Sequence, residues 1–307
     1  MNNIPKQIAI IGATASGKSA LAIKVAKKYN AVILSLDSLS IYKDIDIASA
    51  KPSKEEREGI IHFGIDEISP NEPFDVTIFI ELYKKAYDFA SMNDKNLIIV
   101  GGSSFYLKTL LSGISELPDI SNETKQKTAD MLQKKGKAYD FLYDIDPEYM
   151  SKIKSNDTYR IEKTLNIYLQ TSEKPSLYFL KNPPKPVIQD DLPIFAIETQ
   201  REVLRERIRQ RTLQMIQNGL IDEIKSLENK YTRSPNPMKA IGIKETLDFL
   251  DGKISKDELI ELISTHTAQL AKRQTTFNRT QFEKKIMIKN DEIEIFEKIF
   301  SDSLCLF

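Results

Sequence analysis

The apolar positions in the first third of the chain fall into short runs separated by longer amphipathic stretches. Three runs, Gln7–Ile11, Ala31–Leu36 and Asn96–Val100, are almost wholly apolar. Stretches with helical periodicity, Lys18–Tyr29 and Phe79–Met92, lie between them. Fully apolar strands that alternate with helices are typical of a parallel sheet covered by helices on both faces. The pattern therefore predicts an α/β fold for this part of the chain.

The pattern changes between residues 117 and 190, where we predict no buried strand. Glu123–Gly136 and Thr158–Leu169 are charged and have helical periodicity, and the Pro-rich segment Lys181–Pro186 is typical of a stiff, extended linker. The run Leu192–Ile197 then predicts a strand that returns to the sheet. We therefore expect a core of residues 1–116 and 191–307, interrupted by an all-helical domain at residues 117–190.

The last third of the chain is mainly helical by the same criterion. Long helices are predicted at Arg201–Asn218 and Lys256–Phe282, and a final helix at Glu292–Phe300. A short apolar run, Ile286–Ile288, predicts one more strand. We expect these elements to complete the core.

The residues between the first strand and the first helix match the pattern G-x-x-x-x-G-K-[ST] of a phosphate-binding loop. Successive backbone N–H groups in such a loop form a concave anion nest, the lysine adds a positive charge, and the serine hydroxyl can bind Mg²⁺. We therefore predict a P-loop NTPase-like core that holds a di- or triphosphate group, with Mg²⁺ as cofactor and Ser19 as its ligand. The loop consists of Gly12, Ala13, Thr14, Ala15, Ser16, Gly17, Lys18 and Ser19.

The composition is that of an ordinary enzyme, with 41% hydrophobic and 29% charged residues and a formal net charge of zero. No apolar stretch is long enough to span a bilayer, and the N-terminus lacks the features of a signal peptide. The single cysteine, Cys305, excludes an intrachain disulfide and fits a reducing compartment. We expect a cytoplasmic protein without a membrane partner, and nothing in the sequence requires more than a monomer.

Asp37 follows the second predicted strand, at the edge of the sheet where the phosphate loop lies. A carboxylate at this position can assist in binding Mg²⁺, cap a helix, or act as a general base toward a phosphate ester. The third strand ends in Gly101-Gly102-Ser103, without the aspartate that nucleotide hydrolases usually carry there. The missing aspartate favours two reactions: release of the phosphate as part of an alkyl diphosphate, or phosphate transfer by a small-molecule kinase.

Basic residues are concentrated in a few places, which are either solvated helix faces or a surface for an extended anionic partner. The side chains of Arg201, Arg205 and Arg209 can share one face of a helix. The two histidines, His62 and His266, fit structural roles better than catalytic ones. The basic clusters comprise Arg201, Arg205, Arg207, Arg209 and Arg211, then Lys272, Arg273, Arg279, Lys284 and Lys285, with Lys134, Lys135, Lys152 and Lys154 in the inserted domain.

Several segments together resemble one family, the tRNA dimethylallyltransferases, also called isopentenyl-tRNA transferases. Their order and spacing match from about residue 8 to residue 282. The shared segments are Gly12–Ser19, Asp37–Tyr42, Ala50-Lys51-Pro52, Val100–Ser103 with Tyr106, Ala240–Glu245 and Gln269–Gln274.

The resemblance implies transfer of a dimethylallyl group from dimethylallyl diphosphate to N6 of the adenosine immediately 3′ of a tRNA anticodon. It implies that Asp37 is the general base, that Ser103 lies beside the diphosphate and the modified nucleotide, and that Arg273 joins the loop in holding the diphosphate. The inserted domain would contact the anticodon stem-loop. The residues that fall where relatives contact tRNA are Asp37, Ser38, Leu39, Ser40, Ser103, Lys125, Tyr159, Arg160, Ile161, Glu162, Lys163, Lys239, Ala240, Ile241, Gly242, Ile243 and Lys244.

The main departure from the family pattern is Ala268, which occupies a position where relatives commonly carry arginine. Two other hypotheses remain at this point. A small-molecule phosphotransferase would use the same loop to move the γ-phosphate of ATP, with the inserted domain as its lid. A non-catalytic RNA-binding protein would keep the loop as a relic, which the loss of the arginine at Ala268 would favour.

Overall fold

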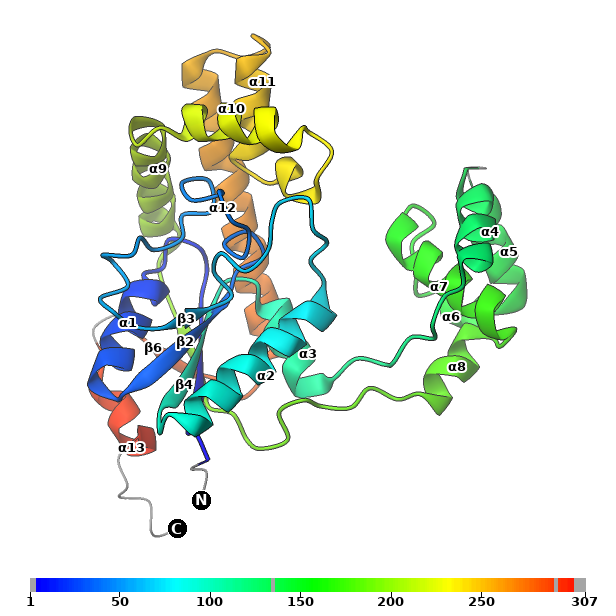
Figure 1. Ribbon diagram of the computed structural model, residues 1–307, viewed down its shortest axis with the longest axis horizontal. Coiled ribbons are helices and arrows are strands. Elements are labelled where there is room, and N and C mark those ends of the chain that lie inside the picture. The colour runs from blue at the N-terminus through cyan, green and yellow to red at the C-terminus, as the bar shows by residue number, and fades with distance from the viewer. Residues whose placement is uncertain (1–3, 134–135, 290–291, 301–307) are drawn as a thin grey trace. The chain divides into compact units, whose positions relative to one another are not determined.

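The computed structural model describes residues 4–133, 136–289 and 292–300 (Figure 1). It divides into two compact units, Met1–Leu110 with Ile188–Phe307, and Leu111–Val187. The second unit begins and ends slightly earlier than the insertion expected at 117–190. The sequence-predicted features Lys134, Lys135 and Cys305 lie outside the described residues.

The described strands of the first unit form one parallel sheet in the order β3-β2-β4-β1-β5-β6. All the predicted strands are present, and β3 is an additional one at the edge of the sheet. The strands are β1 (Gln7–Ile11), β2 (Ala31–Leu36), β3 (His62–Phe63), β4 (Asn96–Gly101), β5 (Ile194–Ile197) and β6 (Ile286–Ile288).

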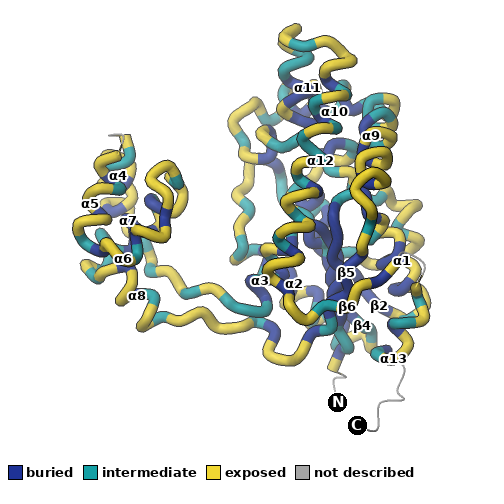
Figure 2. Tube along the Cα trace, turned by 180° about the vertical axis from the view of Figure 1, so that it is seen from behind, coloured by how far each residue is buried: buried dark blue, intermediate teal, exposed yellow. Residues whose placement is uncertain are grey.

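Helices cover both faces of the sheet, as the predicted α/β fold requires (Figure 1). On one face, α1 (Lys18–Lys28) buries Leu21 and Val25 against the strands, together with Phe296 and Phe300 from the C-terminal segment. On the other side, α2 (Val76–Met92) packs on β2 and β4, and α3 (Ser104–Ser112) follows β4. Strands β1, β2, β4 and β5 are consequently almost entirely buried (Figure 2), whereas the edge strand β6 exposes Ile286 and Met287.

The remaining helices of this unit follow β5. Helices α9 and α12 pack along each other, and α10 packs on α11. In place of the single helix predicted at Glu292–Phe300, the structure has a 3₁₀ turn, η2, followed by the short helix α13. These elements are α9 (Arg201–Gln217), α10 (Leu220–Tyr231), η1 (Asn236–Lys239), α11 (Ile243–Leu250), α12 (Lys256–Gln281), η2 (Glu294–Phe296) and α13 (Glu297–Phe300).

The second unit is a small helical domain with a core of its own, built around Leu142, Met150 and Leu165. A buried hydrogen bond of 2.6 Å from Thr128 Oγ1 to Asn166 Oδ1 joins two of its helices. An isolated antiparallel bridge pairs Ile114 with Lys185, near the points where the chain enters and leaves the unit. Its helices are α4 (Asn122–Leu132), α5 (Lys137–Ile145), α6 (Pro147–Met150), α7 (Thr158–Thr171) and α8 (Pro175–Lys181).

The carboxyl ends of three neighbouring strands position the site. In the sheet register Gly101, at the end of β4, pairs with Ile11 of β1 and with Leu36 of β2. A Cβ atom at Gly101 would lie 2.4 Å from the Leu36 carbonyl oxygen, so only glycine permits this close approach. The segments that follow β1, β2 and β4 therefore meet at one edge of the sheet.

Within the described ranges, no helix is both long and apolar enough to cross a membrane.

Candidate active site

The phosphate-binding loop connects β1 to α1 and turns sharply at two residues with positive φ. Gly17, the N-cap of α1, has φ 91°, and Ala15 has φ 62°. Other elements hold the loop from outside: the backbone N–H of Thr14 donates to Gln274 Oε1 of α12 at 2.8 Å. Arg207 of α9 reaches the carbonyl oxygen of Ala15 at 3.4 Å. The loop thus contacts α9 and α12, two of the helices that follow the insertion.

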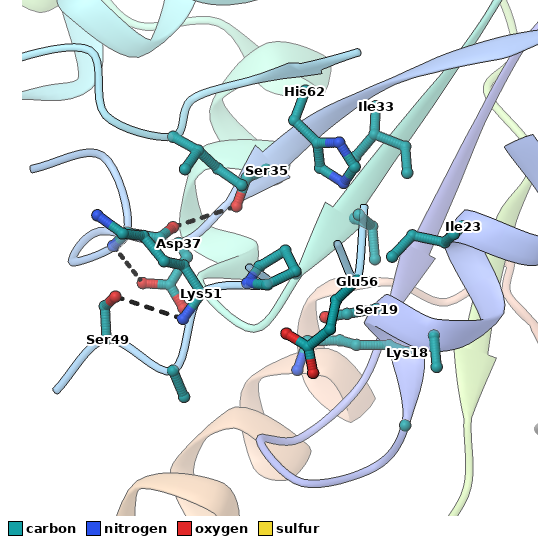
Figure 3. Close-up of a pocket in the computed structure, with 18 of the residues that line it drawn as sticks. Lys18, Ser19, Ile23, Ile33, Ser35, Asp37, Ser49, Lys51, Glu56 and His62 are labelled. Carbon is teal, nitrogen blue, oxygen red and sulfur yellow. Dashed lines mark hydrogen bonds between the residues drawn. The ribbon is translucent and has the colours of Figure 1, made fainter. Parts of the chain in front are cut away.

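A cavity of about 430 Å³ opens in front of this loop. Its wall brings together the loop and α1, the ends of β2 and β4, and the segment from Ser49 to Glu58 (Figure 3). Figure 3 shows Lys18, Ser19 and Glu56 toward one side of the cavity, and Asp37, Ser49 and Lys51 toward the other. Apolar side chains also line it: Ile23, Ile33, Ile65 and Val100. The cavity therefore offers both a charged end and an apolar wall.

Lys18 is a desolvated cation in this wall. Its Nζ donates to the carbonyl oxygen of Ala13 at 3.1 Å. Burial lowers the pKa of Lys18 to about 8, the nearby carboxylate of Asp37 opposes this effect, and the positive charge of Arg211 adds to it. Burial likewise lowers the pKa of Arg211, against the charges of Asp37 and Glu56. Two half-buried cations beside one loop make a site that an anion would stabilise.

Asp37 both organises the turn after β2 and lines the cavity. Its Oδ1 accepts hydrogen bonds from the backbone N–H groups of Leu39 at 2.8 Å and Ser40 at 3.2 Å. The capping role considered from the sequence is therefore present, at a turn instead of a helix. Both of these bonds engage Oδ1, which fixes the plane of the carboxylate. Capping and general-base roles are compatible, because the second oxygen, Oδ2, can face a substrate.

Ser103 lies close to the same turn. Its backbone N–H donates to the Leu36 carbonyl oxygen at 2.9 Å, and its own carbonyl oxygen accepts from Tyr106 at 3.0 Å. Burial raises the pKa of Tyr106 to about 12, so this phenol is neutral at physiological pH. The ring of Tyr106 stacks on Phe79, with centroids 4.8 Å apart. The predicted catalytic serine thus lies between the turn of Asp37 and an aromatic cluster.

A second cavity, of about 290 Å³, adjoins this turn. It joins two segments that the sequence predicts to contact tRNA but that are about 200 residues apart along the chain: Asp37–Ser40 and Lys239–Lys244. Its aromatic wall includes Tyr42, Phe74 and Tyr106. The full lining is Ser38, Leu39, Tyr42, Phe74, Tyr106, Asn236, Pro237, Lys239 and Ala240.

The start of α11, which belongs to the second of these segments, is fixed by a buried carboxylate. Glu245 Oε2 accepts from the backbone N–H of Gly242 at 2.7 Å, while its Oε1 pairs with His266 Nδ1 of α12 at 2.6 Å. His266 thus has the structural role expected for it. His62, in contrast, contributes to the wall of the larger cavity, and burial lowers its pKa, which favours the neutral ring.

Arg273, predicted to hold the diphosphate, is exposed on α12 and is not among the residues that line the larger cavity. Arg211 of α9 occupies that wall instead, with its Nη1 3.5 Å from Thr14 Oγ1. The sequence placed Arg211 in a basic cluster, but no local signal distinguished it from the neighbouring arginines. The contact of Gln274, next to Arg273, with the loop was also not predicted.

The other residues predicted to contact tRNA lie in the helical unit, on α4 and α7. Lys125 is exposed on α4. Tyr159, on the first turn of α7, exposes 67% of its surface, and Lys163 Nζ lies 5.6 Å from the centre of its ring. Arg160 pairs with Asp157 at 3.0 Å. An exposed ring flanked by cations is suited to an RNA loop or backbone.

Comparison with known proteins gives a consistent result. The family model described as IPP transferase matches residues 40–281. A tRNA dimethylallyltransferase of a Sulfurovum species is 58% identical over 96% of this chain and 98% of that protein. A protein of the same name from Sulfurimonas denitrificans is 56% identical over 97% of this chain and 99% of its own length.

Solved structures of similar proteins share the fold. A full-length tRNA isopentenylpyrophosphate transferase from Bacillus halodurans is 27% identical, with a TM-score of 0.69, over 96% of this chain and 94% of that one. A eukaryotic dimethylallyltransferase described as acting on tRNA is 28% identical with a TM-score of 0.81, over 96% of this chain and 76% of that one.

The lowered pKa of Lys18 predicts that binding of an anion takes up a proton. At pH 8.5 the amine is largely neutral without ligand, and a bound diphosphate would stabilise its charged form. Calorimetric binding of inorganic diphosphate in buffers of different ionisation enthalpy measures this uptake. We expect the uptake to be smaller in Lys18→Met, and we expect affinity to decrease more steeply above pH 8 in the wild-type protein than in this variant. Protons gained or lost by diphosphate itself contribute equally in both proteins. Equal proton uptake by the wild-type protein and by Lys18→Met would therefore contradict the assignment of Lys18 as a group that becomes charged on binding.

Proposed function

The chain belongs to the IPP transferase family, and from this premise we propose how its residues perform the family's reaction. The reaction transfers a dimethylallyl group from dimethylallyl diphosphate to N6 of the adenosine immediately 3′ of the anticodon in tRNA. The products are N6-isopentenyladenosine in tRNA and free diphosphate. The observation that carries the assignment of roles is that Asp37, Lys18 and Arg211 line one cavity in front of the phosphate-binding loop.

The diphosphate of the donor binds at the loop. The backbone N–H groups of Gly12–Ser19 form the nest, and Lys18 and Arg211 neutralise the two phosphate groups. Breaking the bond between C1 of the dimethylallyl group and the bridging oxygen leaves the electron pair on the diphosphate. The positive groups therefore stabilise the transition state, in which this negative charge develops, more than the bound substrate. The apolar wall of Ile23, Ile33, Ile65 and Val100 is suited to the five-carbon tail.

The acceptor adenosine must leave the stack of the anticodon loop to reach this site. The smaller cavity offers it an aromatic wall of Tyr42, Phe74 and Tyr106 beside the Asp37 turn. Stacking of a base on such rings typically contributes about 1–3 kcal/mol. Lys239, which lines this cavity, supplies a cation for the RNA backbone in this proposal.

Asp37 acts as the general base. The N6 amine is a poor nucleophile because its lone pair is delocalised into the ring. As the bond from N6 to C1 forms, one N6 proton moves to the Asp37 carboxylate, which typically accelerates such a step about 10²–10⁴-fold. The turn that binds Oδ1 keeps the second oxygen oriented. We assign to Ser103, whose backbone N–H binds the Leu36 carbonyl oxygen, the orientation of the nucleotide and the diphosphate; it lines neither of the two cavities described.

Mg²⁺ fits the oxygen donors near the loop. The Ser19 hydroxyl and the Glu56 carboxylate both line the cavity, and Mg²⁺ prefers such ligands with several waters retained. When bound, the ion would add positive charge beside the leaving diphosphate. The described residues contain no cluster of three or more histidine, cysteine or acidic side chains suited to a metal, which agrees with an ion held mainly by substrate phosphates and water.

The helical unit supplies further contacts to the anticodon stem-loop. Lys125, Tyr159 and Lys163 are its candidates for the backbone and for exposed bases. Because phosphate contacts dominate such binding, affinity for tRNA should decrease steeply with salt.

Transfer of label tests the function directly. We expect radiolabel from dimethylallyl diphosphate to enter undermodified tRNA and to be recovered as N6-isopentenyladenosine after nuclease digestion. Labelled ATP, included as a parallel arm, should transfer no phosphate to RNA or to small acceptors. Label entering a product only from ATP would assign the chain to phosphotransfer instead.

Substituting Asp37 tests its role as a general base separately from its roles in the turn and in tRNA binding. Asp37→Asn keeps an oxygen acceptor for the N–H groups of Leu39 and Ser40 but cannot take the proton, so kcat should decrease at least about a hundredfold. Affinity for tRNA, measured by filter binding, should change little. Asp75→Asn, at the N-cap of α2, is a matched control that should leave kcat near the wild-type value. An unchanged kcat in Asp37→Asn would reassign Asp37 to the turn alone.

The metal assignment predicts that Ser19→Ala weakens binding of the ion. Mn²⁺, which gives an electron paramagnetic resonance signal, can replace Mg²⁺ as the probe. We expect inorganic diphosphate to bring Mn²⁺ onto the wild-type protein and to do so at least about tenfold less tightly in Ser19→Ala, since one direct ligand is lost. Identical spectra and affinities for both proteins would exclude Ser19 as a ligand.

A further inference from the structure

A carboxylate outside the reaction site is bound by three consecutive backbone N–H groups. Glu223, on the first turn of α10, accepts hydrogen bonds from Asp46 at 3.0 Å, Ile47 at 2.7 Å and Ala48 at 2.9 Å. The first two bonds reach Oε2 and the third reaches Oε1, so both oxygens are used. Successive N–H groups that converge on one anion form a nest. Here the anion comes from a helix about 175 residues further along the chain.

The bound segment leads directly into the wall of the donor cavity. Residues 49–52, Ser-Ala-Lys-Pro, follow it and line the cavity opposite the phosphate-binding loop (Figure 3). The side chain of Lys51 is only 4% exposed, and its Nζ pairs with Asp46 at 2.5 Å and donates to the Tyr42 carbonyl oxygen at 3.1 Å. A second ion pair joins Lys51 to Asp66. The wall is therefore held by Tyr42 and Asp66 through Lys51, and by the backbone at 46–48, which precedes it directly in the chain.

The segment has other contacts as well: Ile45 is fully buried, and Ser49 Oγ donates to the carbonyl oxygens of Ile45 at 2.6 Å and Asp46 at 3.2 Å. In these contacts no N–H group of residues 46–48 is the donor. Asp44 Oδ2 accepts from Lys230 Nζ and from Tyr231 Oη, each at 2.7 Å, at the opposite end of α10. Lys230 is largely exposed, and exposed pairs of this kind contribute little. Glu223 is more enclosed: burial raises its pKa, against the effect of the three N–H groups. Losing a partly buried acceptor of three N–H groups would leave those groups without partners, which is costly.

We infer that Glu223 is a positioning residue for the prenyl donor: by binding the backbone of residues 46–48, it fixes the cavity wall formed by residues 49–52. The inference rests on the proposed function, since the donor is taken to bind in that cavity. Glu223 itself is not among the residues that line the cavity. Its loss should therefore weaken donor binding more than it slows the chemical step, because Asp37 and its turn are held separately.

The test compares Glu223→Gln and Glu223→Ala with the control Glu228→Gln. Glu228 lies on the same helix but pairs with Arg233, away from the segment. Glutamine keeps the size of the side chain, but its NH₂ group cannot accept a hydrogen bond, so at least one of the three N–H groups loses its acceptor. We expect both Glu223 variants to raise KM for dimethylallyl diphosphate about tenfold or more while kcat stays within about threefold. KM for tRNA and all constants of the Glu228 variant should remain near wild type.

Hydrogen exchange gives a readout that does not depend on activity. In the Glu223 variants the amides of residues 46–48 should exchange faster than in the wild-type protein, whereas amides of β1 and β4 should not. Unchanged exchange at 46–48, or faster exchange without a change in the donor KM, would overturn the inference. If Glu223→Ala does not fold, Glu223→Gln decides by the same two measurements. Absence of transfer by the wild-type protein would instead refute the proposed function.

Discussion

The interaction between Lys18 and Asp37, with Arg211 beside them, is the constraint on which the site depends. Removing two cations from water is unfavourable, and the nearby carboxylates of Asp37 and Glu56 offset only part of this effect. In our proposal a diphosphate supplies the missing negative charge, and the electric field of the free protein is already complementary to this leaving group. Catalysis by such a preorganised field requires little rearrangement when the bond breaks.

The helices that follow the insertion hold the loops that precede it. Gln274 of α12 binds the phosphate-binding loop, and Glu223 of α10 binds the segment beside the cavity. Glu245, paired with His266, fixes the start of α11 close to the aromatic cavity. Each is a side-chain oxygen that accepts from backbone N–H groups with no partner in a helix or strand. The two cavities are therefore framed by polar contacts between distant parts of the chain, on a base of parallel strands.

The features predicted from the sequence are those that depend on a local pattern of residues. Strands β1, β2, β4, β5 and β6 follow from apolar runs, and the phosphate-binding loop from its motif. The sequence did not predict β3, which is too short to give a period. It did not predict that Arg211 lines the cavity while Arg273 does not, because the orientation of a helix toward the loop is a tertiary property. The nest around Glu223 was also not visible, since backbone N–H groups carry no sequence signature.

The most direct test is a structure of the protein with an anticodon stem-loop and an unreactive thio analogue of dimethylallyl diphosphate. We predict the diphosphate in the nest of Gly12–Ser19, within reach of Lys18 and Arg211. The N6 atom of the extruded adenosine should lie within hydrogen-bond distance, about 2.6–3.2 Å, of the Asp37 carboxylate. A diphosphate bound elsewhere, or an adenosine whose N6 faces away from Asp37, would contradict the proposed chemistry.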